Sequence, residues 1–281
     1  MKYIGAHVSI AGGFSKCIER AVALGANCLQ TFASSPRSLS TAPYPTEELE
    51  RYRAAKKNAQ MGPHFFHGVY LVNLASEKKG YVQASVASLI FYQQLLGKIG
   101  GEGTIFHIGS HKGAGFETVK AQVVAAIAQV LEQTPDGVKL FLENAAGHKG
   151  VIGDQLEELG EIIKELPNSD KVGVCLDTQH AFASGYDVRT QAGIDLLLAD
   201  FDFHIGLDYL RVIHANDSLV EFNSKRDRHQ NIGEGFIGDQ GFHLMLAHPI
   251  LKNLPWVLEV PGENKSGPRV EDVARLKQLS V

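Results

Sequence analysis

The strongest constraint on the fold is a regular alternation of short apolar segments with amphipathic segments along the chain. Short apolar segments between turn residues are typical of buried strands, and an apolar residue every three or four positions is typical of a helix. The predicted strands cover residues 2–8, 27–32, 62–68, 104–108, 138–144, 172–177, 209–215 and 255–260. The predicted helices cover residues 14–24, 46–59, 80–98, 116–133, 154–165, 189–202, 240–247 and 269–279.

This order of elements favours one arrangement within the α/β class. The commonest closed solution to strands alternating with helices, in a chain of 281 residues, is a (β/α)8 TIM barrel. The alternative is an open doubly wound sheet, but no glycine-rich dinucleotide-binding turn follows the first strand. Because no linker or repeat divides the chain, we expect a single-domain TIM barrel over residues 1–281.

The composition excludes several classes of protein. Hydrophobic residues make up 44% and charged residues 21%, which is ordinary for a globular chain with a large core. No apolar run approaches the ~18–20 residues that span a bilayer, and the first residues do not form a secretory signal. The three cysteines, Cys17, Cys28 and Cys175, are far apart, which argues against a disulfide framework or a cysteine zinc site. We expect a cytoplasmic protein with no membrane partner.

After the first, six of the eight predicted strands have an acid or a histidine at their last or next-to-last position. In a TIM barrel, the C-terminal ends of the strands form the face on which active sites are built. The six residues are His67, His107, Glu143, Asp177, His214 and Glu259. His180 lies just past the sixth strand, and Asp227 and His229 lie in a long connection over residues 216–238. That connection and residues 33–45 exceed the usual loop of about 4–6 residues, and long loops often carry function.

Strand alternation turns these residues into a candidate metal site. Cys175 and Asp177 share one face of a strand, as do Val257 and Glu259, so the acids can converge inside the barrel. Several carboxylates buried together repel each other strongly unless cations lie among them. Histidine and carboxylate ligands suit zinc or a similar metal. Since zinc takes about four ligands, nine candidates suit two or three ions better than one.

Each residue taken alone has a simpler explanation. Asp177 and His180 could be a helix N-cap and a turn histidine, and Glu259 could be a solvated acid at the rim. Capping chemistry does not explain why six of eight strands end in this way, so we favour the metal site. His7 and His111 lie closer to the predicted opening and are candidates to orient the ligands.

The sequence resembles the endonuclease IV family, the zinc-dependent abasic-site endonucleases (AP endonuclease family 2) of DNA base-excision repair. The resemblance covers nearly the whole chain. It is carried by GAHVSIAGG (5–13), HGVYLVNL (67–74), FHIGSH (106–111), LENAAG (142–147), VCLDTQHAFASGYD (174–187), HAND (214–217), SKRDRH (224–229), GEG (233–235) and LEV (258–260).

The resemblance implies three zinc ions per chain, with Mn2+ as an alternative at one position. It implies the same nine ligands that the strand ends indicate: His67, His107, Glu143, Asp177, His180, His214, Asp227, His229 and Glu259. The expected reaction is hydrolysis of the phosphodiester 5′ of an abasic site in double-stranded DNA, which leaves a 3′-hydroxyl. Glu143 is the expected catalytic residue because it would bridge two zinc ions.

The family also inserts side chains into the DNA at the lesion, and the matching residues here are Arg37, Tyr70 and Leu71. The formal net charge of −4 does not oppose a DNA partner. Three Zn2+ would bring the chain to about +2, so an acidic sequence can still offer a positive surface to phosphate. We expect the protein to act as a monomer.

The chain departs from the family at four positions. Relatives usually have Cys where Gln179 stands, commonly Lys at Leu219 and Gly at Asn223, and often an aromatic residue near Leu39. None of these changes removes a metal ligand. Those near the DNA face bear on the grip on the lesion and on substrate preference, not on the class of reaction.

Two other functions compete with a nuclease. A single-metal sugar isomerase or epimerase on the same barrel would use only Glu143, Asp177, His214 and Glu259, which leaves five of the nine candidates without a role. A DNA-damage binder without catalytic activity is the other, and the complete set of ligands argues against it. Metal content and a cleavage assay separate the three.

Overall fold

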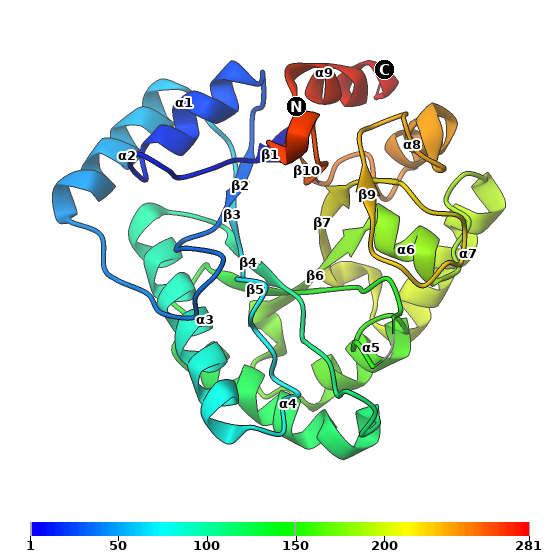
Figure 1. The fold of residues 1–281 in the computed structure, drawn as a ribbon, viewed down its shortest axis with the longest axis horizontal. Helices are drawn as coiled ribbons and strands as arrows, with labels where there is room; N and C mark the ends of the chain where they lie inside the picture. The colour runs from blue at the N-terminus through cyan, green and yellow to red at the C-terminus, as the bar shows by residue number, and fades with distance from the viewer. Residues whose placement is uncertain (1, 149, 281) are drawn as a thin grey trace.

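Eight parallel strands close into a barrel in the computed structural model, which describes residues 2–148 and 150–280. The order around the barrel is β1-β10-β7-β6-β5-β4-β3-β2, so each strand pairs with a neighbour on both sides. Figure 1 shows the helices as an outer ring around these strands, with α9 beside the N-terminal end of the chain. The TIM barrel expected from the sequence is confirmed.

Every predicted strand is present, generally shorter than expected because the ends of the apolar segments run into the loops. The barrel strands are β1 (Ile4–His7), β2 (Leu29–Thr31), β3 (His64–His67), β4 (Gly103–Phe106), β5 (Lys139–Glu143), β6 (Val172–Asp177), β7 (Leu210–Ala215) and β10 (Trp256–Leu258).

Every predicted helix is also present, and the described residues contain one α-helix that was not predicted. The eight expected helices are α1 (Lys16–Ala23), α2 (Thr46–Asn58), α3 (Lys79–Ile99), α4 (Phe116–Glu132), α5 (Leu156–Glu165), α7 (Gln191–His204), α8 (Gly238–Ala247) and α9 (Val270–Leu279). The additional helix, α6 (Thr178–Ser184), follows β6 without a loop and is too short to show a helical period. Among the residues described, no helix combines the length and apolar character needed to cross a membrane.

The second long connection folds back over the barrel mouth. It contains two short antiparallel strands, β8 (Asp217–Ser218) and β9 (His229–Gln230), in which Ser218 pairs with His229. The segment between them is the β8–β9 loop, residues 219–228. Strands of two residues show no alternation, so the sequence did not predict this pairing. The pairing brings Asp227 and His229 to the mouth of the barrel.

An apolar layer fills the interior of the barrel below its mouth. Its members come from seven strands or strand starts: Cys28, Phe65, Ile105, Phe141, Cys175, Val212 and Val257. The rings of Phe65 and Phe141 meet edge to face, with centroids 5.8 Å apart. The first strand contributes Gly5, where a Cβ would lie 2.1 Å from the carbonyl oxygen of Cys28, so a larger residue does not fit. The barrel is therefore a packed core and not a pore.

Phe141→Ala should lower the free energy of unfolding by about 3–5 kcal/mol, because it leaves a cavity in this layer. The matched control is Phe203→Ala, since Phe203 is 83% exposed on α7 and should change stability by less than about 0.5 kcal/mol. Chemical denaturation of both variants measures the difference. Equal effects of the two substitutions would show that the interior layer is not tightly packed.

Candidate metal centre

The polar layer at the mouth lies one alternation step above the apolar layer. Each predicted strand-end residue stands two positions after an interior apolar residue, as Glu143 follows Phe141 and Asp177 follows Cys175. Residues two apart on a strand point to the same side. The same rule therefore sends both members of each pair into the barrel, the apolar one below and the polar one at the mouth.

The structure brings all nine predicted ligands together, and we call them the ligand cluster. Three overlapping groups have ligand atoms that all lie within 4.8 Å of one another: His67, Glu143, His214 and Glu259; His107, Glu143 and His180; and Asp177, His180 and His229. Asp227 joins the last group, with its carboxylate oxygens 3.5 Å from Nε2 of His180 and 3.3 Å from Nε2 of His229. Overlap of this kind suits several neighbouring cations.

Glu143 lies at the centre of the cluster and is fully buried. Its Oε2 is 3.2 Å from Nε2 of His67 and 3.6 Å from Nε2 of His107, whereas its Oε1 is 2.8 Å from Nδ1 of His214. Burial opposes ionisation of Glu143, but the adjacent histidines outweigh it and hold the pKa well below its usual range. The two oxygens of one carboxylate thus face two different sets of ligand atoms.

The charges of the cluster call for cations. In the described parts of the chain, no lysine or arginine forms an ion pair with any of its four carboxylates, which contact histidines instead. Burial disfavours the charged ring of His180, but Asp177 and Asp227 outweigh it and raise its pKa to about 10. A ring that attracts a proton so strongly lies in an excess of negative charge, which a bound metal ion can neutralise instead.

The hydrogen bonds of the histidines fit metal binding. Four rings each donate a hydrogen bond from one nitrogen to a supporting oxygen: His67 Nδ1 to the Gly68 carbonyl (2.7 Å), His180 Nδ1 to the Asn144 carbonyl (2.9 Å), His214 Nε2 to Gln30 Oε1 (2.9 Å) and His229 Nδ1 to the Glu259 carbonyl (3.3 Å). In the neutral ring the other nitrogen then faces the cluster without a proton, as a metal requires. Among the described residues, Nε2 of His180 and Nε2 of His229 are buried and have no hydrogen-bond partner.

The geometry of Asp177 fits both roles that its sequence position left open. As the N-cap of α6, its Oδ1 accepts a hydrogen bond of 2.9 Å from the backbone N–H of His180. Its Oδ2 faces the cluster, 3.8 Å from Nε2 of His229 and 3.9 Å from Nδ1 of His214. Capping orients the carboxylate and leaves its second oxygen for a metal.

Three residues that hold the ligands in place were not predicted from the sequence. Asn144 receives the backbone N–H of Asp177 on its Oδ1 at 2.6 Å, and Asn216 donates to Oδ2 of Asp177 at 2.6 Å. Gln30 accepts from His214 and donates to Oε1 of Glu259. Alternation could have found Gln30, which stands two positions after an interior residue of the apolar layer. The two asparagines follow strand ends, where a polar residue is common and carries no distinct signal.

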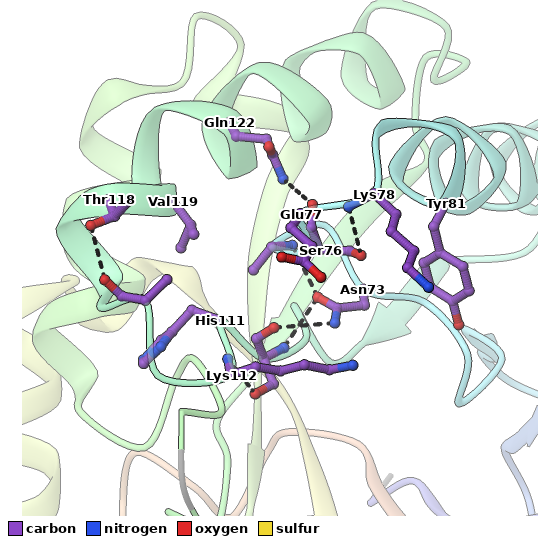
Figure 2. A pocket seen from close by; sticks show the side chains of 13 residues that line it. Asn73, Ser76, Glu77, Lys78, Tyr81, His111, Lys112, Thr118, Val119 and Gln122 are labelled. Atoms are coloured by element: carbon purple, nitrogen blue, oxygen red, sulfur yellow. Dashed lines mark hydrogen bonds between the residues drawn. The ribbon is translucent and has the colours of Figure 1, made fainter.

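The two histidines expected to orient ligands differ in position. His7 lies at the mouth, with Nδ1 3.3 Å from Oε1 of Glu259, as expected. His111 does not reach the cluster: its Nδ1 accepts backbone N–H groups of Gly113 and Gly115 in its own loop. It lines another pocket, of about 630 Å³, together with Lys112, and Figure 2 shows both side chains there. The expectation for His111 was wrong because the turn after the fourth strand carries its side chain away from the mouth.

The mouth is an open pocket of about 410 Å³, lined by histidines of the cluster and by Phe32 and Tyr70. Tyr70 is 70% exposed and Leu71 38% exposed, and the Tyr70 ring meets Phe32 edge to face at 5.3 Å. Arg37 is exposed in the first long connection. The three residues with a predicted DNA role are therefore accessible to a large ligand.

Asn223 is one departure from the family that the structure explains. Its φ of 57° lies in the left-handed region, where glycine is favoured and asparagine is tolerated better than most residues. Leu219, by contrast, lies exposed in the β8–β9 loop, and Leu39 is half-buried against the core. Nothing in the structure explains these two substitutions.

Comparison with known proteins shows which family and which solved structures the chain is similar to. A family described as the xylose isomerase-like TIM barrel matches residues 18–279. A probable endonuclease 4 of Halothermothrix orenii is 39% identical over 275 residues, which covers 98% of this chain and 99% of the relative. The crystal structure of endonuclease IV from Thermus thermophilus aligns with a TM-score of 0.84 and 31% identity over 99% of this chain and 97% of that one. A D-tagatose 3-epimerase-like protein aligns at 0.72 and 18% identity over 99% of this chain and 95% of that one, which shows the fold alone.

The fold and the site together define a xylose isomerase-like TIM barrel with a histidine–carboxylate cluster suited to metal ions at its C-terminal mouth. The full-length similarity to the relative from Halothermothrix orenii is more specific. The chain belongs to the endonuclease 4 family.

Zn2+ added to metal-free protein should raise its melting temperature, because an ion that binds only the folded chain stabilises it. His229→Ala should reduce this rise, since it removes one nitrogen from the cluster. The matched control is His243→Ala, whose ring bonds the carbonyl of Leu279 outside the site. Thermal unfolding followed by circular dichroism measures the shifts. A melting temperature that does not respond to zinc would contradict the metal centre.

Proposed function

We propose that the chain hydrolyses the phosphodiester bond 5′ of abasic sites in double-stranded DNA and leaves a 3′-hydroxyl, with three zinc ions held by the ligand cluster. One observation carries the proposal: all nine candidate ligands meet at one mouth in three overlapping groups. A single-metal sugar isomerase needs about four of them. The whole chain would act as one catalytic domain, as a monomer in the cytoplasm.

The distances suggest how the residues would share the ions. His67 and His107 face one oxygen of Glu143, and these three residues would hold one ion. The other oxygen of Glu143 lies beside His214, whose Nδ1 is also 3.2 Å from Oε2 of Glu259. Glu143 would therefore bridge two ions and fix their separation.

His180, Asp227 and His229 would hold a third ion, and Asp177 faces both His214 and His229 from the side. Zinc held here would supply Lewis acidity, which activates water as a nucleophile at neutral pH and neutralises charge on the phosphate. The chain's own contribution is to keep these side chains in place before the DNA arrives. The hydrogen bonds from Asn144 and Asn216 to Asp177 do this for one ligand.

The exposed residues at the rim suit a damaged duplex. A nucleotide without a base has lost its pairing and stacking, so turning it out of the helix costs least at the lesion. Apolar side chains that enter the gap stabilise a kinked duplex. Tyr70 and Leu71 project from the loop after β3 beside the mouth, where they could fill this gap, and Arg37 lies exposed on another loop.

A nicking assay tests the proposal directly. Zinc-loaded protein should cut a labelled duplex that contains one tetrahydrofuran abasic analogue on the 5′ side of the analogue, and a DNA polymerase should extend the product. The same duplex without the lesion is the control. Absence of nicking, together with one divalent ion per chain and turnover of a ketose or aldose, would identify a sugar isomerase instead.

Glu143→Gln should abolish nicking and leave the fold largely intact, because an amide offers one oxygen where the bridge requires two. Glu132→Gln, at an exposed glutamate that ends α4, is the matched control and should nick normally. Circular dichroism of both variants checks the fold. Retained nicking by Glu143→Gln would mean that this carboxylate does not bridge two ions.

Leu71→Ala should lower kcat/KM for the abasic duplex roughly ten-fold or more, because the truncated side chain no longer buries its apolar surface in the gap. Its zinc content should not change. Leu196→Ala removes an exposed leucine from α7, on the outer ring, and serves as control. Steady-state nicking at several DNA concentrations measures the effect. Unchanged kinetics would exclude Leu71 from the contact with the lesion.

A further inference from the structure

Gln179 occupies an unusual position between two members of the ligand cluster. It lies in the first turn of α6, after Asp177 and before His180, and its side chain is fully buried. Among the described residues, its amide forms no hydrogen bond with the side chain of either neighbour. Instead its Nε2 donates to the carbonyl of Arg226 at 3.0 Å and to Oγ of Ser218 at 3.4 Å.

These two bonds tie α6 to both arms of the β8–β9 pair. Ser218 belongs to β8, which pairs with β9 at His229. Arg226 lies on the returning arm, immediately before Asp227. One amide group of α6 therefore bonds both to β8, at Ser218, and to the residue before Asp227.

The Asp227 side chain has few partners of its own, and its backbone is held on both sides, by Gln179 at Arg226 and by the N–H of Leu219, which donates to the carbonyl of Arg228 at 2.9 Å. This side chain is 46% exposed, and its carboxylate contacts only His180 and His229 among the described residues. No other donor in the described ranges reaches the carbonyl of Arg226. The position of the Asp227 carboxylate is therefore set largely by its backbone, one peptide unit from the carbonyl that Gln179 holds.

Backbone bonds hold the rest of the β8–β9 loop independently. The N–H of Asn223 donates to the carbonyl of Phe182 at 3.1 Å, and the N–H of Lys225 donates to the carbonyl of Ala183 at 3.0 Å. These bonds remain when Gln179 is replaced. Loss of its amide should therefore loosen the end of the loop near Asp227 and leave the loop itself docked on α6.

The two polar atoms of the Gln179 amide differ: Nε2 donates to the Arg226 carbonyl, and Oε1 is buried and has no hydrogen-bond partner among the described residues. An unpaired buried oxygen is unfavourable, and an apolar side chain of the same size would avoid it. Such a side chain would leave the Arg226 carbonyl without its donor.

We propose that Gln179 is a positioning residue for the metal group formed by His180, Asp227 and His229. Its amide holds the Arg226 carbonyl, and this places the Asp227 carboxylate between the two imidazoles. The inference rests on the proposed function, since it assumes that this group binds a zinc ion.

The test compares two buried glutamines. Gln179→Met keeps the size of the side chain and removes the donor. Gln93→Met makes the same change at a buried glutamine that bonds Thr134 and the carbonyl of Lys139, outside the metal centre. Zinc per chain is measured after dialysis against a graded series of chelator concentrations, and the wild-type chain should retain three ions.

Gln179→Met should bind one of the three zinc ions about ten-fold more weakly, as is found when a residue that supports a ligand is lost, and the other two normally. Gln93→Met should bind all three like the wild type. In metal-free form Gln179→Met should melt no lower than Gln93→Met, which also loses the hydrogen bond that Oε1 of Gln93 accepts from Thr104. Should Gln179→Met not fold, Gln179→Leu carries the same expectation, because its side chain also has no donor for the Arg226 carbonyl.

Three zinc ions of unchanged affinity in the Gln179 variant would overturn the inference. Equal loss of zinc in Gln93→Met would also overturn it, because the effect would then be a general loss of stability. A wild-type chain that binds only one ion would instead contradict the proposed function. The failure of the two proposals is therefore distinguishable.

Discussion

The accumulation of negative charge at the barrel mouth is the constraint on which the rest of this structure depends. Glu143 and Asp177 are fully buried, and Asp227 and Glu259 lie close to them at the rim. Removing carboxylates from water is costly, and their mutual repulsion adds to that cost. With no lysine or arginine paired to any of the four in the described ranges, cations bound by the histidines are the available compensation. Metal binding and folding of the mouth should therefore be coupled.

The barrel tolerates this charge because the carboxylates stand one step of strand alternation above the apolar interior. Phe141 and Cys175 close the interior from below, and Glu143 and Asp177 stand two residues later on the same strands. A shift of one residue in any strand would exchange an inward ligand for an outward one. The pairing of β6 with β7, in which Asp177 lies opposite His214, shows that the registers match at the level of the ligands.

Three members of the cluster do not stand at the ends of barrel strands, so strand alternation alone does not position them. His180 reaches the mouth from α6, and Asp227 and His229 reach it from the connection that contains β8 and β9. Loops are less rigid than barrel strands, so their ligands need local anchors. Gln179 and the backbone bonds between α6 and the β8–β9 loop are such anchors. A xylose isomerase-like barrel with ligands on its barrel strands alone would not need them.

The sequence by itself determined the order of strands and helices, the closed barrel, and the set of residues that gather at its mouth. It could do so because alternation and helical period are local properties, and because parallel strands in a barrel present their C-terminal ends on one face. Only the tertiary structure decided which atoms meet. The two oxygens of Glu143 face different histidines, Asn144 and Asn216 hold Asp177, and His111 turns away into another pocket. These facts depend on contacts between residues up to 76 positions apart, which no local pattern encodes. Gln179 belongs to the same class, because its partners Arg226 and Ser218 become neighbours only when the chain folds back over the mouth.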